Sequence, residues 1–435
     1  MKVYFAANMY FTYTFCLFVG LLVSAPWYLI RSRQHISTLK SRFGYLNIPN
    51  LKRSIWVHAV SVGEVRAVGK LMERLRLQYP GHPIVLSTIT PTGQQLAREI
   101  PGLADHVFYF PFDFPGCVRR TLARINPVLV IIAETEIWPN FLRKCRHRKI
   151  TVMMINGRIS DRSFPRYRWI RPWLKTVLND YSVMGMQTEL DRERIESLGA
   201  NRKKVQVFGN LKFDVLSGLQ PLEPKLTQVL NANQPLWIAA STTAAGTARS
   251  VNEEEFVLTA FAALRQSHPR LKLLIAPRHP ERFPVVEQLV LARGFQCARR
   301  TASNGSHWST TAPSFTDVLL LDTIGELAST FPYASVVFMG GTLVPRGGHN
   351  ILEPAAASRA IVFGPHMENF REIVSLFLDA GAAIQVRDPD ELASAVDRLL
   401  RDATATATLG ENARRVVERN AGATEKVIAF LGAER

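Results

Sequence analysis

The chain has 435 residues, of which 47% are hydrophobic and 20% charged, so it is long enough for two folded domains and too apolar to be disordered. Its 53 Lys and Arg residues exceed its 36 Asp and Glu residues, and the net charge of +17 favours an anionic partner. The basic residues are scattered, so we expect a membrane surface or an acidic substrate and no nucleic acid. The four cysteines lack CxxC or Cys/His zinc spacing, which predicts a reducing compartment and no structural metal.

The N-terminal segment, residues 3–30, contains no charged side chain and exceeds the ~20 residues that a helix needs to cross a bilayer. Basic residues follow it at Arg31, Arg33, Lys40 and Arg42, whereas only Lys2 precedes it. This asymmetry places the rest of the chain in the cytoplasm, so we expect residues 1–30 to be a signal-anchor helix in the cytoplasmic membrane. A cleaved secretory signal and a monotopic helix lying in the membrane interface are the alternatives.

Beyond residue 50, short apolar runs alternate with patterns of helical period, as in a parallel sheet with helical crossovers. The strands predicted in the first half are residues 55–60, 83–88, 106–110, 128–133, 151–156, 181–186 and 205–209. Those of the second half are residues 236–241, 271–276, 317–322, 334–341, 360–364 and 383–387. The scheme therefore occurs twice and predicts an α/β protein of two Rossmann-like domains that face each other across a cleft.

A linker is expected at residues 217–235, which carry three prolines and no strand pattern. It divides the chain into a first domain at residues 31–220 and a second domain at residues 221–435. The motifs GxxxxGK[ST] and GxGxxG are absent from the sequence, which argues against P-loop and dinucleotide-binding folds.

Charged residues follow several strands of the first half. Glu64 lies in "SVGEV" after the first strand, Glu134 directly follows the apolar run "VLVIIA", and Lys212 follows "VQVFG". The carboxyl ends of parallel strands form the edge where ligands bind, and two poorly solvated carboxylates there suit acid/base chemistry. The alternatives are a first-turn acid that complements the helix dipole for Glu64 and an ordinary surface residue for Lys212.

The second half repeats this arrangement. Arg278 and His279 follow the strand "LLIAP", where an arginine can bind phosphate with two hydrogen bonds or pair with Glu281 at the rim. The segment "GGTLVPRGGHNILEPAAA" at residues 340–357 follows the strand "SVVFM" and precedes a helix expected to start at Pro354. Capping alone explains neither the two Gly-Gly pairs nor the residues between them, so we interpret this loop as a ligand-binding loop.

Seven motifs together resemble the 3-deoxy-D-manno-octulosonic acid (Kdo) transferases of lipid A biosynthesis. In chain order they are "HAVSVGE", "STITPTG", "AETEIWPN", "GNLKFD", "APRHPERF", "TIGEL" and "GGTLVPRGGHNILEPAA". The resemblance covers nearly the whole chain. It implies a membrane-attached glycosyltransferase of the GT-B type that transfers Kdo from CMP-Kdo to a lipid A precursor of the lipid IVA type, with inversion, in lipopolysaccharide core biosynthesis. It implies neither a metal nor a cofactor.

The resemblance also implies the site residues. Glu64 would be the general base, with Glu134 and Lys212 assisting at the transition state. The residues that would hold CMP-Kdo are Pro277, Arg278, Ile324, Gly325, Glu326, Asn350, Ile351, Leu352 and Glu353. Since Glu353 would repel a phosphate, it is better placed on the ribose hydroxyls.

One stretch departs from the family pattern. Where "STHEGEE" is expected, the chain has "STTAAGTARSVNEEE", with Thr243 in place of the histidine and an insertion before the acidic run. This puts in doubt a role of that loop in holding the donor. Two other classes remain open: an epimerase of soluble nucleotide sugars, which would not need the uncharged N-terminal span, and a non-catalytic membrane protein, which would not need Glu64 or Glu134.

Overall fold

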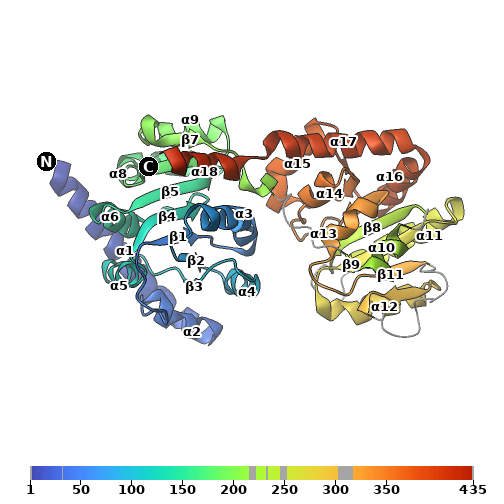
Figure 1. The fold of residues 1–435 in the computed structure, drawn as a ribbon, viewed down its shortest axis with the longest axis horizontal. Coiled ribbons are helices and arrows are strands. Elements are labelled where there is room, and N and C mark those ends of the chain that lie inside the picture. Colours follow the sequence, from blue (N-terminus) through green and yellow to red (C-terminus); the bar gives the residue numbers. More distant parts are fainter. Residues whose placement is uncertain are drawn as a thin grey trace. The chain divides into compact units, whose positions relative to one another are not determined.

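The computed structural model describes residues 2–31, 33–214, 222–231, 234–244, 252–301 and 317–433. The chain forms two compact units, one of Met1–Val215 with Ala421–Arg435 and one of Leu216–Asn420. Each unit contains one seven-stranded sheet, and all the paired strands are parallel. The prediction of two parallel α/β sheets is therefore confirmed (Figure 1).

The sheet of the first unit has the strand order β3-β2-β1-β4-β5-β6-β7. Its strands are β1 (Ser54–His58), β2 (Ile84–Thr88), β3 (His106–Tyr109), β4 (Pro127–Ala133), β5 (Thr151–Gly157), β6 (Val183–Met186) and β7 (Val205–Val207). The side chains of the central strands are buried on both faces of the sheet. Successive side chains point to opposite faces, so they enter two different cores. Trp56 and Val130 thus enter one core, whereas Ile55 and Ile131 enter the other.

Helices cover both faces of this sheet. Those of the first unit are α1 (Lys2–Arg31), α2 (Arg33–Arg42), α3 (Val62–Gln78), α4 (Pro91–Glu99), α5 (Pro115–Ile125), α6 (Pro139–His147), α7 (Phe164–Trp169), α8 (Arg171–Leu178), α9 (Glu189–Ser197) and α18 (Ala423–Ala433). Helices α5, α6 and α8 pack on the Trp56 face, and α3, α4 and α18 on the opposite face. Both faces are therefore shielded from water, as parallel strands require.

The last helix, α18, belongs to the first unit, whereas the sequence-based division placed it in the second. Figure 1 shows it, in red, among the blue and green elements of the first unit. Val427 and Leu431 are buried in the core that α3 also lines. Asp214 fixes the start of the helix, because its carboxylate accepts the backbone N–H groups of Gly422 and Thr424 at 2.6 Å each. These contacts join residues that are far apart in the chain, so no local sequence pattern predicts them.

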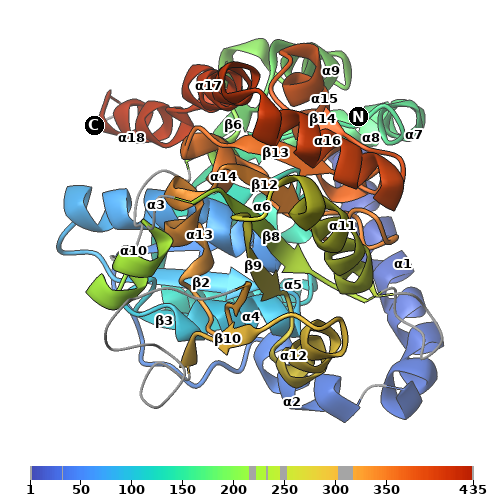
Figure 2. The same cartoon turned by 90° about the vertical axis from the view of Figure 1, so that its right-hand side faces the viewer.

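The sheet of the second unit has the order β10-β11-β9-β8-β12-β13-β14. Its strands are β8 (Leu236–Thr242), β9 (Lys272–Pro277), β10 (Cys297–Arg299), β11 (Val318–Leu320), β12 (Val336–Met339), β13 (Ala360–Phe363) and β14 (Ile384–Gln385). Its helices are α10 (Pro224–Leu230), α11 (Glu253–Ser267), α12 (Phe283–Ala292), α13 (Leu327–Thr330), α14 (Leu352–Ala356), α15 (Arg371–Asp379), α16 (Pro389–Arg401) and α17 (Ala403–Asn420). Helices α11, α12 and α16 share one core with the strands, and Figure 2 shows α11 and α12 on that side of β8.

All the strands predicted from the apolar runs are present, and β10 was missed because "CAR" has no apolar run. The predicted linker contains a helix, α10, whose Leu226 and Val229 are buried. Residues 217–221 and 232–233 of that linker lie outside the described residues.

The N-terminal helix α1 packs against the first unit through one side. Tyr10 is buried and its hydroxyl donates a hydrogen bond to Asp180 at 2.6 Å. Thr14 contacts Asn140, and the Tyr13 ring lies against Trp173 at 5.8 Å. Among the residues that the structure describes, no helix combines the length and the apolar character needed to cross a membrane.

Candidate active site

The candidate catalytic residues of the first unit lie at the carboxyl edge of its sheet. Glu64 follows β1, Glu134 follows β4 directly, and Lys212 follows β7. The charges of Glu134 and Lys212 both act on the pKa of Glu64, and Lys212 forms an ion pair with Glu134. The structure therefore brings together the three residues that the sequence singled out in this half of the chain.

Glu64 is held by its own loop. It is the third residue of α3, and its carboxylate accepts the Val60 N–H at 2.8 Å and the Ser61 hydroxyl at 2.9 Å. Such backward contacts resemble a capping box, so part of its role is to stabilise the start of the helix. Burial, which exceeds the other effects, raises the pKa of Glu64, and Glu134 adds to the rise. The Val60 N–H, Ser61 and Lys212 lower it. A carboxylate with a raised pKa is suited to accept a proton near neutral pH.

Glu134 has an unusual backbone conformation. Its φ of +61° lies in the left-handed region, which residues with a Cβ rarely adopt. Such strain is concentrated at functional sites, where the surrounding structure maintains it. The Glu134 Oε1 lies 3.4 Å from Lys212 Nζ, and both side chains are about one-third exposed, so a substrate can reach them.

Glu136 is a third carboxylate that the sequence reasoning missed. Burial, and then the charges of Glu64 and Glu134, together raise its pKa to about 7, whereas Trp138 lowers it. Its carbonyl oxygen accepts a hydrogen bond from the buried Tyr181 hydroxyl, which fixes the loop. The signal was present in the sequence, because Glu136 stands two residues after Glu134 in the same "ETEIW" stretch.

The candidate donor-binding residues also follow strands at the carboxyl edge of their own sheet, that of the second unit. Pro277 ends β9 and is buried, whereas Arg278 is exposed directly after it. The Arg278 N–H donates to the Thr242 carbonyl at the end of β8 at 2.9 Å. This hydrogen bond fixes the Arg278 backbone and therefore the position of its Cα atom beside the strand ends.

The "TIGEL" loop after β11 is anchored by a residue that the sequence reasoning missed. Ile324 is exposed, Gly325 has a φ of +96°, and Glu326 accepts hydrogen bonds from Arg300 at 3.1 and 2.9 Å. Arg300 also pairs with Glu223 at 2.9 Å. The bidentate contact orients the Glu326 carboxylate. Arg300 follows β10, the strand without an apolar pattern, so no sequence signal pointed to it.

The Gly-rich loop after β12 wraps around a buried carboxylate. Glu253, at the start of α11, accepts backbone N–H groups from Gly341, Thr342 and Leu343 at 2.6, 3.0 and 3.0 Å, and from Thr243 at 3.2 Å. The pKa of Glu253 is raised to about 7, because the effect of burial exceeds the opposing effect of these four N–H groups. A side chain on Gly340 would meet the Glu253 carboxylate at 2.8 Å, so glycine is required there.

The acidic run at the end of "STTAAGTARSVNEEE", the stretch that differs from the family pattern, thus has a structural role. Glu253 shapes the Gly-rich loop, and the neighbouring Glu254 is fully buried against Arg282, with contacts of 3.1 and 2.8 Å. Residues 245–251, which make up most of the insertion before this run, lie outside the described residues.

The end of the Gly-rich loop is a short helix that starts earlier than the sequence suggested. Helix α14 begins at Leu352 and Pro354 is its third residue, because Asn350 Oδ1 accepts the Leu352 N–H at 3.1 Å and so begins the turn. The Asn350 amide donates to Glu353 at 3.4 Å, while Ile351 and Leu352 are buried. The polar side chains of this stretch are therefore Asn350 and Glu353, and the two apolar ones hold it in place.

Known proteins match the chain over nearly its full length. Residues 37–215 match the family described as 3-Deoxy-D-manno-octulosonic-acid transferase (kdotransferase). A 3-deoxy-D-manno-octulosonic acid transferase of Haemophilus influenzae is 33% identical over 418 residues, which cover 95% of this chain and 94% of that protein. The chain belongs to the Kdo transferase family. A member from Bordetella pertussis is 32% identical and covers 88% of this chain and 87% of its own length.

Solved structures with little sequence identity share the fold. A UDP-GlcNAc 2-epimerase from Neisseria meningitidis is 12% identical, with a TM-score of 0.56 over 88% of this chain and 99% of that one. A glycosyltransferase from Rickettsia africae is 11% identical, with a TM-score of 0.52 over 87% and 97%. These likenesses concern the fold alone. Membership of the Kdo transferase family makes this chain a glycosyltransferase that transfers Kdo.

Proposed function

We propose that the chain is an inverting glycosyltransferase of the GT-B type that transfers Kdo from CMP-Kdo to a lipid A precursor of the lipid IVA type in lipopolysaccharide biosynthesis. The observation that carries the proposal is the grouping of Glu64 with the Glu134–Lys212 ion pair at one sheet edge of a Kdo transferase. A buried carboxylate beside an accessible cation and a second carboxylate has the groups that a single displacement needs.

In this mechanism Glu64 acts on the acceptor. Its carboxylate takes the proton from an acceptor sugar hydroxyl as the hydroxyl oxygen forms a bond to the anomeric carbon of Kdo. The bond from that carbon to the CMP oxygen breaks, and its electron pair leaves with CMP. Glu134 stabilises the positive charge that develops on the sugar, and Lys212 stabilises the negative groups of the donor. Because there is one displacement and no covalent intermediate, the configuration inverts.

The second unit would hold the donor. CMP carries one phosphate, and we propose that Arg278 neutralises it, while Glu326 and Glu353 accept hydrogen bonds from hydroxyls of the donor. The contacts of Arg300 and Glu253 support this proposal, because they fix the two loops that carry these residues. The residues that hold the nucleotide would thus belong to a different unit from the base.

A product assay tests the proposal. Purified full-length protein is incubated with CMP-Kdo and lipid IVA, and the lipid product is identified by mass spectrometry. We expect the mass of lipid IVA plus Kdo and the release of CMP. Hydrolysis of CMP-Kdo without a glycosylated lipid would contradict the proposed acceptor, and no consumption of CMP-Kdo would contradict the proposed donor.

We also propose that α1 attaches the protein to the cytoplasmic face of the inner membrane. The side of α1 that does not pack on the first unit carries apolar residues at helical spacing, each more than half exposed: Phe11, Phe15, Phe18, Leu22 and Val23. An apolar stripe of this kind on a docked helix is typical of a helix that lies in the membrane interface.

Cell fractionation tests the attachment. The full-length chain is expected in the membrane fraction, and a reporter fused to its C-terminus is expected to be active only as a cytoplasmic one. Phe15→Ser together with Phe18→Ser should release the protein, whereas Leu190→Ser, an exposed apolar residue on α9, should not. A periplasmic reporter signal would contradict the topology.

A further inference from the structure

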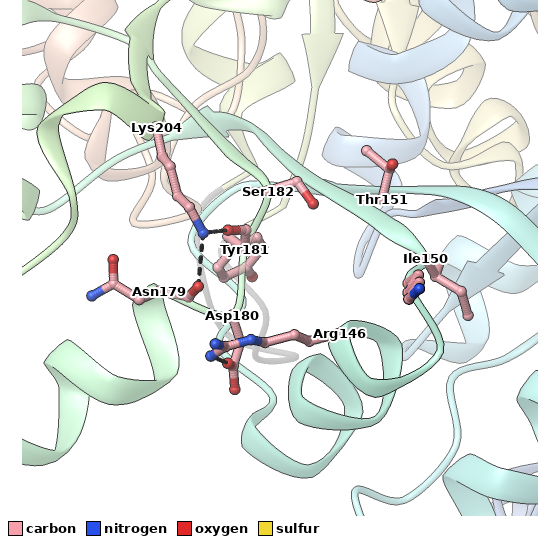
Figure 3. Close-up of a pocket in the computed structure, with 9 residues that line it drawn as sticks. Arg146, Ile150, Thr151, Asn179, Asp180, Tyr181, Ser182 and Lys204 are labelled. Carbon is pink, nitrogen blue, oxygen red and sulfur yellow. Dashed lines mark hydrogen bonds and ion pairs between the residues drawn. The ribbon is translucent and has the colours of Figure 1, made fainter. Parts of the chain in front are cut away.

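A second polar site lies at the opposite edge of the first unit's sheet from Glu64. It is a cavity of about 230 Å³ between the C-terminal end of α6 and the amino ends of β5, β6 and β7. Figure 3 shows Arg146, Asp180 and Lys204 around it, with Thr151 and Ser182 at its wall. The candidate catalytic residues follow strand ends and do not line it, so the cavity has no part in the proposed chemistry.

The cavity carries excess positive charge. Three cationic side chains line it, Arg146, Lys149 and Lys204, against one carboxylate, that of Asp180. The Asp180 side chain is only 3% exposed, and its two oxygens already accept the Arg146 guanidinium at 2.7 Å and the Tyr10 hydroxyl at 2.6 Å. Its charge is therefore compensated within the protein, and the lysines face the cavity without a carboxylate partner among the lining residues.

Lys204 is positioned by the backbone. Its ammonium donates to the carbonyl oxygens of Asn179 at 2.8 Å and Tyr181 at 2.7 Å, as the dashed lines in Figure 3 mark. An ammonium has three protons, so one remains for a ligand. Burial lowers the pKa of Lys204 and the charge of Arg146 lowers it further, whereas Asp180 raises it. A bound anion would relieve both unfavourable effects.

The cavity adjoins the helix proposed to lie on the membrane. Tyr10, which contacts Asp180, is a residue of α1, and the Arg143 guanidinium lies 4.2 Å from the centre of its ring. The next residue, Phe11, is 75% exposed and begins the apolar stripe. Lipid phosphates lie at the level of the interface, and basic residues beside an inserted apolar surface bind anionic headgroups.

We propose that this cavity binds the phosphate of an anionic membrane lipid, with Arg146, Lys149 and Lys204 as its ligands. A lipid held there fixes the rotation of the first unit about α1, because the apolar stripe and the phosphate contact define two points on the bilayer surface. The proposal rests on the proposed attachment through α1, but not on the identity of the sugar donor.

Vesicle flotation of the full-length protein tests it. The wild type is compared on phosphatidylcholine vesicles and on vesicles that also contain phosphatidylglycerol. Lys149→Ala is expected to weaken binding to the anionic vesicles about fivefold and to leave binding to phosphatidylcholine unchanged. The matched control is Lys203→Ala, which removes an exposed lysine next to Lys204 that does not line the cavity. It is expected to leave both affinities unchanged.

The outcomes separate the two proposals. Wild-type binding to both vesicles with no effect of Lys149→Ala overturns the phosphate site and leaves attachment through α1 intact. Equal losses for Lys149→Ala and Lys203→Ala overturn it as well, because they indicate surface charge alone. Absence of wild-type binding to either vesicle overturns both proposals. Phosphorus NMR with inorganic phosphate distinguishes the sources: line broadening that Lys149→Ala removes, without an effect on vesicles, indicates a free-phosphate site and contradicts the lipid.

Discussion

At the scale of single residues, the proposed chemistry depends on how Glu64 is held. The hydrogen bonds from the Val60 N–H and the Ser61 hydroxyl position its carboxylate, and burial keeps its pKa above the ordinary value of 4.5. A carboxylate with a raised pKa takes up a proton more readily than an ordinary glutamate does. Its neighbours Glu134 and Lys212 act on its pKa in opposite directions, which makes the arrangement testable by charge removal.

Glu64→Gln should lower Kdo transfer by about 10²- to 10⁴-fold, the range for loss of a general base. The amide keeps the size of the side chain and can still accept hydrogen bonds, but it cannot take the acceptor proton. Affinity for CMP should persist, because the second unit is proposed to hold it. The control is Glu73→Gln, an exposed glutamate on the same helix, α3. Near-normal turnover of Glu64→Gln together with a large loss for Glu134→Gln would assign the base to Glu134.

The pH profile should respond to the two neighbours with opposite signs. Transfer rises with pH as Glu64 loses its proton. Glu134→Gln removes a negative charge that raises the pKa of Glu64, so the rising limb of the residual activity should move to lower pH. Lys212→Met removes a cation that lowers this pKa, so the limb should move to higher pH. Single-turnover rates across pH measure both shifts, and a limb that stays in place in both variants would show that another group titrates.

At the scale of secondary-structure elements, loops at the strand ends are held by residues from distant elements. Glu253 at the start of α11 binds the Gly-rich loop after β12, and Arg300 after β10 binds the loop after β11. Asp214, before the second unit begins, binds the first residues of α18. In each case a charged side chain satisfies backbone or carboxylate groups of a segment that is distant in the chain.

Asp214→Ala should destabilise the first unit by about 0.5–2 kcal/mol, the cost of losing a helix N-cap. The backbone N–H groups of Gly422 and Thr424 lose their acceptor, and α18 loosens from the core that holds Val427. Urea unfolding followed by far-UV circular dichroism measures the change. Glu193→Ala, at an exposed position on α9, serves as the control. Equal unfolding free energies for the two variants would show that Asp214 does not secure the helix.

At the scale of the whole molecule, the two units have separate cores and separate proposed tasks. The first carries the proposed base and the helix proposed to contact the membrane, and the second carries the proposed donor loops. A ligand that binds only one unit raises the unfolding free energy of that unit by mass action. The unfolding free energy of the other unit stays unchanged. The unfolding behaviour of the full chain therefore reports where the nucleotide binds.

CMP at about 100 times its dissociation constant should stabilise the second unit by about 2.7 kcal/mol. Hydrogen exchange with mass spectrometry should show protection in β9, β11 and β12 and no change in β1 or β4. Arg278→Ala should weaken CMP binding by about 1.5–3 kcal/mol, the scale of a hydrogen bond to a charged group. Arg270→Ala, an exposed arginine before the start of β9, should leave it unchanged. Protection around Glu64 instead would contradict the assignment.

The sequence by itself determined the strands other than β10, the parallel α/β class, and the position of Glu64, Glu134, Lys212 and Arg278 after strand ends. These features are local, since apolar runs define buried strands and a residue that follows such a run must lie at the sheet edge. The quoted motifs also sufficed for the family resemblance. Side-chain type and position along the chain carry all of this information.

Only the tertiary structure decided which distant groups meet. Arg300 pairs with Glu326, Glu253 supports the Gly-rich loop, α18 joins the first unit, and a basic cavity forms at the amino ends of β5, β6 and β7. Each of these features depends on the strand order and the helix packing, which bring separate segments together. Strand β10, which precedes Arg300, has no apolar run from which it could be predicted. Hydrophobic periodicity is a property of neighbouring residues, whereas the partner of a buried charge is set by the whole fold.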